Sequence, residues 1–261
     1  MVKKILSLIM FILLLQVMSV ASEELTFLSK DKETKETVKI KDKTFTHSIT
    51  YSYPEVTGYK DKTSEDTFNK YISSIIDKDV EDFKKEIKEA EKGMADSDMP
   101  AELLQSYFNI EYSIINKTSD LISIKFLTEV YYAGAAHPSH AIWGLNYSLT
   151  SGKAINPGDL FKKDSNYLSV LSDYSIKELS EKAKKDGKEQ GYEPDYNWIK
   201  EGASPKEENF VYFNMTEKDL IIHFNEYQVD CYAAGPKDVI IPYSALKDII
   251  DPAGPAWCFI K

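Results

Sequence analysis

The strongest candidates for chemistry in this sequence are two histidines three positions apart, His137 and His140. Imidazole nitrogens bind zinc, and a turn at Pro138 would let both rings face one ion. A third protein ligand would have to be His223 or an acidic residue, and no spacing marks one. The alternative is that residues 134–138 form a tight connection between strands, in which His137 holds the loop by hydrogen bonding. We favour this alternative and expect neither a metal nor a cofactor.

Nucleophilic catalysis has little support. The sequence contains no Gly-x-Ser-x-Gly elbow, and we expect the thiol of Cys231 to be oxidised. Among 42 carboxylates, close pairs arise by chance, so paired acids do not indicate a glycosidase. We therefore predict no catalytic residue and favour a binding protein over an enzyme. A hydrolase acting on peptidoglycan or another glycan, with a site centred on His137, is the alternative.

Two segments have a composition suited to binding. Residues 131–140 and 232–237 each combine aromatic residues with small residues and a proline, and rigid rings bind partners at low entropic cost. The alternative is that their tyrosines complete a core at strand ends. The candidate ligand-binding residues are Tyr131, Tyr132, His137, Pro138, Tyr232 and Pro236. An aromatic centre ringed by acidic residues would suit a cationic protein.

The charge of the chain narrows the choice of partner. The 261 residues carry a formal net charge of -10, and every basic residue is a lysine. This acidity argues against nucleic acid as a partner and against direct adhesion to anionic polymers. It favours long-range attraction of a cationic partner, although acidity also keeps an exported protein soluble.

The N-terminus has the pattern of an export signal. Lys3 and Lys4 precede an apolar run over 5–20, and small residues follow at Ala21 and Ser22. The run is shorter than the ~20 residues that span a bilayer, and no second run of that length follows. We predict a signal peptide over 1–22, no membrane span after cleavage, and a periplasmic or extracellular location.

Cysteine usage suggests one cross-link. Cys231 and Cys258 are the only cysteines, and export would place them where a disulfide persists. On the chain-entropy model such a bridge contributes roughly 3–4 kcal/mol, and it would hold down the tail 251–261. Two independent thiols are the alternative.

The elements that must position these residues follow from hydrophobic periodicity. Apolar residues at steps of three and four predict a long amphipathic helix over 63–93 and a second over 165–185. Strands are predicted at 25–28, 37–40, 44–53, 107–116, 121–132, 140–149, 210–215, 220–224 and 239–243. A helical turn is predicted at 156–161, a polar loop at 188–208 and a short helix at 244–250.

This order predicts an α+β fold of antiparallel sheets, each packed by a long amphipathic helix, in two subdomains rather than by βαβ winding. We expect a signal peptide at 1–22, an N-terminal subdomain at 23–117, a C-terminal domain at 118–250, and a disulfide-tethered tail at 251–261.

A series of short motifs in the second half of the chain resembles a known family. The motifs are YYAGAAHP (131–138), NYS (146–148), SGK (151–153), DLF (159–161), FNEYQV (224–229), YAAGP (232–236) and IPYS (241–244). Their order and spacing resemble the extracellular domain of RsiV-like anti-sigma factors, which is also found in PdaC-like peptidoglycan deacetylases. Residues 34–117 resemble, more weakly, the non-catalytic N-terminal domain of the same proteins.

The resemblance implies binding rather than catalysis. In RsiV-like proteins this region binds lysozyme, while a cytoplasmic segment holds a sigma factor; here we expect a signal peptide in its place. In PdaC-like proteins a separate metal-dependent module performs deacetylation, and no Thr-Phe-Asp-Asp motif of that module occurs here. We therefore expect an exported cell-envelope binding protein that binds or inhibits lysozyme. The alternative to lysozyme is peptidoglycan, recognised without being altered.

Overall fold

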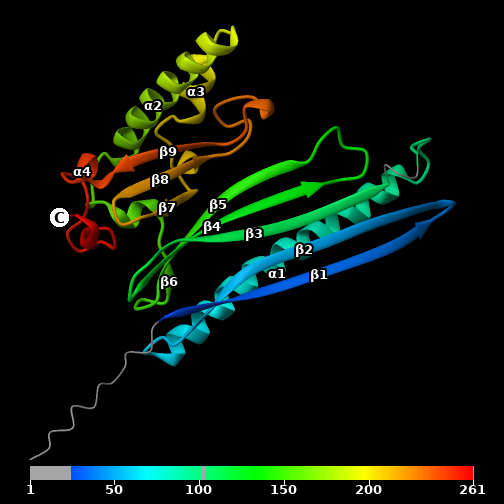
Figure 1. The fold of residues 1–261 in the computed structure, drawn as a ribbon, viewed down its shortest axis with the longest axis horizontal. Coiled ribbons are helices and arrows are strands. Elements are labelled where there is room, and N and C mark those ends of the chain that lie inside the picture. Colours follow the sequence, from blue (N-terminus) through cyan, green and yellow to red (C-terminus); the bar gives the residue numbers. More distant parts are fainter. Residues whose placement is uncertain (1–24, 101–103, 261) are drawn as a thin grey trace, which may run out of the picture.

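The computed structural model describes residues 25–100 and 104–260, so the predicted signal peptide at 1–22 lies outside the described residues. The described chain forms one six-stranded sheet and one three-stranded sheet with helices packed on them, which confirms the α+β class (Figure 1). The strands are β1 (Thr26–Ile40), β2 (Lys43–Thr57), β3 (Gln105–Lys117), β4 (Leu121–Tyr131), β5 (Ser139–Ser148), β6 (Lys153–Ala154), β7 (Phe213–Met215), β8 (Asp219–Phe224) and β9 (Lys237–Pro242). The α-helices are α1 (Lys62–Met94), α2 (Tyr167–Gln190), α3 (Tyr196–Gly202) and α4 (Tyr243–Leu246).

The larger sheet follows chain order from β1 to β6, and its neighbours are antiparallel except for β2 and β3. The expectation of antiparallel sheets without βαβ winding was wrong at this pair. Helix α1 carries the chain back along the sheet, so β3 starts beside Thr46, near the start of β2, and runs in the same direction. The predicted division after residue 117 falls between β3 and β4, which pair in this one sheet; the two-subdomain description stays a prediction.

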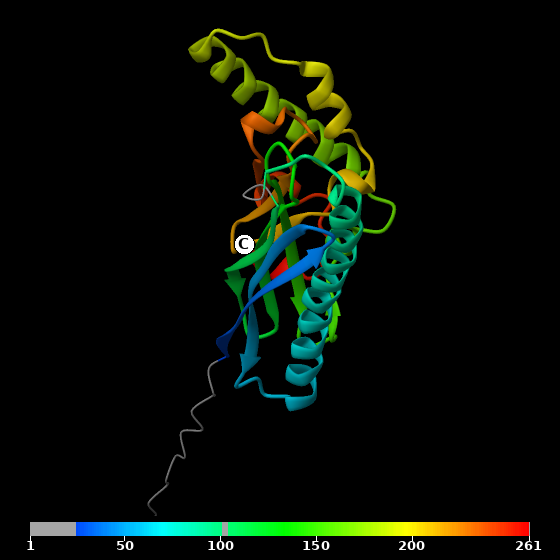
Figure 2. The same cartoon turned by 90° about the vertical axis from the view of Figure 1, so that its right-hand side faces the viewer.

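Helix α1 forms because its apolar residues fall on one face. Phe68, Ile72, Ile76 and Ile87 are each at most 1% exposed. They share a core with strand residues such as Ile124, whose immediate neighbours along β4, Ser123 and Lys125, point to the other side of the sheet. Figure 2 shows the helix along one face of the strands. In the described part of the chain, no helix covers the other face of β1, β2 and β3.

The two short strands predicted at 25–28 and 37–40 are one continuous strand, β1, paired with β2 from Thr26 to Ile40. The charged residues between the two predicted segments belong to this strand. As an edge strand with mostly exposed side chains, β1 accommodates Lys, Glu and Asp without burying charge, and charged edges discourage pairing with other chains.

The smaller sheet, ordered β7-β8-β9, is covered by α2 and α3 (Figure 1). The predicted loop at 188–208 was wrong, because it contains α3. The Asp195 side chain caps this helix by accepting hydrogen bonds from the backbone of Asn197 and Trp198, and Ile199 is buried beneath it. Helix α2 runs to Gln190, beyond the predicted end at 185, and Gly191 caps it with a left-handed φ of 78°.

The two sheets meet through buried amides at the contact of β7 with β4 and β5. The Asn146 Nδ2 donates to the Phe213 carbonyl at 2.8 Å, and the Asn214 Nδ2 donates to the Ser123 hydroxyl at 2.9 Å. A Cβ on Gly144 would lie 1.8 Å from the Phe213 carbonyl oxygen, so β5 and β7 approach closely only because residue 144 is a glycine. These contacts fix how the second half of the chain sits on the first.

The predicted disulfide was wrong: neither Cys231 nor Cys258 takes part in one. Cys231 follows Asp230, whose carboxylate lies 3.7 Å from the Lys237 amine at the start of β9. Cys258 lines a cleft together with Tyr243, at the other end of β9. The two cysteines therefore lie near opposite ends of β9, whose six extended residues span ~20 Å. A disulfide needs Cα atoms within about 7 Å of each other.

Within the described residues no helix has the length and apolar character needed to cross a membrane.

Candidate binding site

Aromatic side chains gather where the connection between β4 and β5 meets the connection between β8 and β9. In Figures 1 and 2 these connections, green and orange, lie near each other. The His137 and Tyr232 rings stack with centroids 3.7 Å apart, and the Tyr227 hydroxyl lies 3.5 Å from His137 Nε2. We call this group the aromatic cluster; its members are Tyr107, Tyr131, His137, His140, Tyr227 and Tyr232.

The β8–β9 connection is docked on β5 by side-chain amides. The Asn225 Oδ1 accepts from the Ile142 backbone N–H at 2.6 Å, and its Nδ2 donates to the Ile142 carbonyl at 3.0 Å. The Asn225 side chain thus pairs with β5 as another strand would. From the same connection, the Gln228 Nε2 donates to the carbonyls of Gly202 and Asn209. The loop that carries Tyr227 and Tyr232 is therefore tied on both sides.

His140 lies between two carboxylates. Its Nδ1 is 2.8 Å from Glu226 Oε1, its backbone N–H donates to Glu226 Oε2, and its Nε2 is 3.9 Å from Glu129 Oε1. The Glu226 side chain is 8% exposed and the His140 side chain 28%, so the pair is partly shielded from solvent. Partial burial, together with the negative charge of Glu226, raises the pKa of Tyr232. The rings of the cluster therefore lie in a region of negative potential.

Tyr107 and Tyr131 complete the cluster on the sheet itself. They are opposite each other on β3 and β4, and their rings stack with centroids 5.6 Å apart. The Tyr107 hydroxyl donates a hydrogen bond to Glu129, and this bond raises the pKa of Tyr107 to about 12. The Tyr131 hydroxyl donates to the Ala135 carbonyl. The sheet and the β4–β5 connection are thus joined through the tyrosines.

The cluster continues into the uncovered face of the larger sheet. Ser48 is paired with Tyr107, and Thr50 is paired with Asn109, across the parallel β2–β3 pair. Because alternate residues of a strand share one face, these polar side chains lie on the same side as Tyr107 and Glu129. A polar face of hydroxyl and amide groups therefore adjoins the aromatic rings.

The structure brings together three of the predicted binding residues, namely Tyr131, His137 and Tyr232. Tyr132 points the other way: its ring packs on Phe83 of α1 and its hydroxyl donates to Glu86. For Tyr132 the alternative of core packing therefore holds. Pro138 belongs to the same connection, and its carbonyl lies 2.8 Å from His137 Nδ1. Pro236 is half-buried directly before β9.

Sequence analysis missed Tyr107, Glu129, Glu226 and Tyr227 as members of the site. Glu226 and Tyr227 lie within the quoted FNEYQV motif, which signalled the resemblance but no role. Tyr227 has a φ of 64°, a left-handed conformation uncommon for tyrosine, and no sequence pattern reveals it. Tyr107 could be identified only by knowing the β3–β4 register, in which Tyr107 lies opposite Tyr131.

The hypothetical metal site does not form as considered. His223, the possible third ligand, lies in the contact between the sheets, with Nε2 2.8 Å from Asn214 Oδ1 and Nδ1 2.7 Å from Asp238 Oδ1. Among the residues placed by the structure, no group of three or more His, Cys, Asp and Glu side chains is arranged to hold a metal ion.

Comparisons with known proteins divide the chain into two regions. Residues 40–140 match the family described as deacetylase PdaC, and residues 158–244 match a family of unknown function, DUF3298. The chain is 28% identical over 208 residues to the peptidoglycan-N-acetylmuramic acid deacetylase PdaC of Bacillus subtilis. This match covers 80% of the chain but only 39% of that protein. The predicted PdaC-like resemblance is confirmed, while the RsiV-like resemblance stays a prediction.

Solved structures support the fold. A DUF3298 family member from Bacteroides fragilis is similar with a TM-score of 0.61 at 18% identity, covering 86% of this chain and 94% of that one. A DUF3298 family protein from Pseudomonas aeruginosa gives a TM-score of 0.52 at 12% identity, with 87% and 95% covered. The first matched region contributes Tyr107, Tyr131 and both histidines of the cluster, and the second contributes Tyr227 and Tyr232. This chain therefore joins a PdaC-like region to a DUF3298-like region, and the aromatic cluster is built where the two meet.

Proposed function

We propose that this chain is a non-catalytic binding protein of the cell envelope, exported to the periplasm or the cell exterior, that holds a cationic protein on its aromatic cluster. The observation that carries the proposal is the stacked His137–Tyr232 pair, placed beside Glu129 and Glu226 in loops that hydrogen bonds hold in place. A pre-ordered aromatic surface loses little entropy on binding, and neighbouring carboxylates favour a partner that presents lysines or arginines.

Lysozyme is the partner to test first. Lysozyme is cationic, so its charge is opposite to that of an acidic binding surface. The resemblance of residues 131–138 and 224–236 to RsiV-like domains also implies lysozyme binding. The net charge of -10 supports the same choice, because it attracts cationic proteins over long distances.

The test is surface plasmon resonance with C-type lysozyme at low salt. Tyr232→Ala removes the ring that contacts His137, Tyr227 and His140, and we expect it to weaken binding at least about tenfold. Tyr196→Ala is the matched control, since Tyr196 is 37% exposed on α3 and should leave binding unchanged. Absence of binding by the unaltered chain, or equal binding by Tyr232→Ala, would refute lysozyme as the ligand of this cluster.

Peptidoglycan is the second candidate ligand, and the named activity of the Bacillus subtilis relative favours it. Aromatic rings beside a polar face of Ser48, Thr50 and Asn109 also suit a sugar chain. Sedimentation with purified sacculi separates the candidates: loss of co-sedimentation in Tyr232→Ala, without any lysozyme binding, would identify a glycan as the ligand. Incubation of the chain with muropeptides, followed by mass spectrometry, tests the non-catalytic part of the proposal; a deacetylated or cleaved product would refute it.

A further inference from the structure

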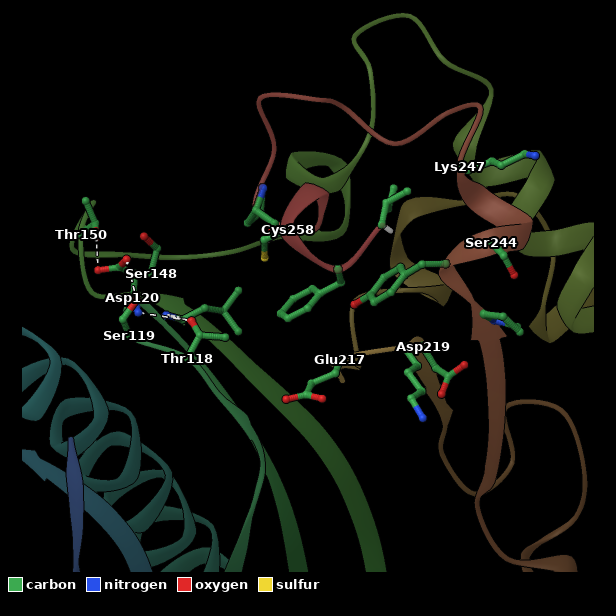
Figure 3. Close-up of a pocket in the computed structure, with 17 residues that line it drawn as sticks. Thr118, Ser119, Asp120, Ser148, Thr150, Glu217, Asp219, Ser244, Lys247 and Cys258 are labelled. Carbon is green, nitrogen blue, oxygen red and sulfur yellow. Dashed lines mark hydrogen bonds between the residues drawn. The ribbon is translucent and has the colours of Figure 1, made fainter. Parts of the chain in front are cut away.

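A large cleft lies at the other end of β4 from the aromatic cluster. It has a volume of about 1100 Å³ and is lined by the β3–β4 turn, the β7–β8 turn, the start of α4 and the C-terminal segment. Figure 3 shows Thr118, Asp120 and Thr150 on one side of it, with Glu217 and Lys247 across the opening. Since β4 runs from Leu121 to Tyr131, ~33 Å separate the cleft from the cluster.

One buried polar atom in the cleft wall has no partner among the described residues. Tyr243 is 2% exposed, and its hydroxyl makes no hydrogen bond to any described residue. Burial raises the pKa of Tyr243, with Asp219 and Cys258 adding to the effect, so the hydroxyl keeps its proton. Leaving such a group unpaired is unfavourable, and buried hydroxyls in folded proteins ordinarily have a partner. The Tyr243 hydroxyl thus lacks a partner that a ligand entering the cleft beside it would supply.

The cleft also offers apolar surface for a flat ring. Tyr243 and Phe259 stack with centroids 5.7 Å apart and planes within 9° of parallel. Leu121, Pro242 and Ile260 extend this apolar lining, while Ser148 and Ser244 add hydroxyl groups. Apolar walls with a few hydrogen-bonding groups are typical of small-ligand sites, and the volume of this cleft is slightly above their usual range.

The charges around the cleft decide the kind of ligand. The carboxylate of Asp120 is already paired with the Lys60 amine at 2.9 Å, and its hydrogen bonds hold the pKa of Asp120 far below its usual range. The remaining charged lining residues are two carboxylates, Glu217 and Asp219, and two amines, Lys218 and Lys247. A phosphate-bearing ligand needs an excess of positive charge and a polyamine an excess of negative charge. The balance favours a neutral ligand.

We propose that this cleft binds a short neutral oligosaccharide, with a sugar ring against Phe259, which stacks on Tyr243, and a sugar hydroxyl or amide paired to the Tyr243 hydroxyl. A neutral polyhydroxylated ring with one apolar face matches the lining in charge, polarity and shape. The site is independent of the partner proposed for the aromatic cluster, since the two share no residue.

Isothermal titration calorimetry of the full chain tests the site with two neutral probes, tri-N-acetylchitotriose and cellotriose. Binding of either at millimolar concentration supports the proposal, and their ratio tells whether the acetamido groups are recognised. Tyr243→Phe should weaken binding about threefold to tenfold, the range expected for one hydrogen bond. The same variant should unfold at an equal or higher temperature, because the hydroxyl has no partner in the free protein.

Tyr147→Phe is the matched control. Tyr147 also has a buried hydroxyl without a partner, but it packs on Phe68 in the other core and does not line the cleft. It should bind both probes as the unaltered chain does, and so should Tyr232→Ala. The proposal is overturned if neither trisaccharide binds, if Tyr243→Phe binds as tightly as the unaltered chain, or if the cationic de-N-acetylated chitotriose binds more tightly than the neutral probes.

Discussion

At the scale of single residues, the Tyr107–Glu129 hydrogen bond determines how the aromatic cluster responds to pH. A tyrosine hydroxyl that donates to a carboxylate is stabilised in its neutral form, because ionisation would place two negative charges together. The pKa of Tyr107 therefore rises to about 12, with partial burial adding to the effect of Glu129. In the unfolded chain a tyrosine has a pKa of about 10. The folded state thus holds this proton more tightly than the unfolded state does.

Removing the acceptor should return Tyr107 towards ordinary behaviour. In Glu129→Gln the carboxylate charge is gone, and we expect the Tyr107 midpoint to fall by about one pH unit or more, followed by NMR of labelled tyrosine rings. In the unaltered chain the stabilising contribution of this bond should be complete below pH 10 and decline as the pH rises towards 12. Glu217→Gln, a change in the distant cleft, should leave the midpoint where it is. An unchanged midpoint in Glu129→Gln would contradict the assignment.

At the scale of elements, the position of the second half of the chain depends on the contact between β5 and β7. The Gly144 backbone lies so close to Phe213 that no other residue fits, and the Asn146 and Asn214 amides satisfy the polar groups buried beside it. Small residues and paired amides allow two sheets to meet where ordinary side chains would hold them apart. The loop carrying Tyr232 is docked on β5 by Asn225, at a distance that the β5–β7 contact helps to set.

We expect Gly144→Ala to destabilise the protein by about 3 kcal/mol or more, since its Cβ would lie 1.8 Å from a backbone oxygen that cannot move alone. The matched control is Gly93→Ala near the end of α1, where a Cβ meets nothing within 4 Å. There alanine should raise stability by roughly 0.5–1 kcal/mol, because it favours the helix. Urea denaturation measures both, and equal effects of the two substitutions would argue against the close β5–β7 contact.

The sequence predicted the elements far better than their pairing. The helix over 63–93 and the strand over 121–132 were found within a few residues, because each has a strong period and turn residues at its ends. The parallel β2–β3 pair could not be predicted, since nothing local tells which way a strand runs beside another. For the same reason Tyr131 was predicted as a binding residue while its stacking partner Tyr107 was not. The helix α3 was missed because its seven residues bury only Ile199.

At the scale of the whole molecule, the charge and the two candidate sites act over different distances. The aromatic cluster and the cleft occupy opposite ends of β4, so the two candidate sites are separate surfaces. The net charge of -10 is spread over the whole chain and distinguishes partners before contact, by attracting cations and repelling anions. The rings of the cluster act only after contact. Affinity for a cationic protein should accordingly separate into a salt-dependent and a ring-dependent part.

This separation can be measured with lysozyme as the partner. Raising the ionic strength from about 0.05 to 0.5 M shortens the range of electrostatic attraction, so the association rate should fall about tenfold or more while the dissociation rate changes less. Tyr232→Ala leaves the net charge unaltered, so it should keep the same salt dependence of association and mainly accelerate dissociation. Stopped-flow mixing over a salt series provides both rates. An association rate independent of salt would mean that the acidity of the chain serves solubility alone. A Tyr232→Ala variant with slower association and unchanged dissociation would mean that the ring acts before contact, against the arrangement inferred for the cluster.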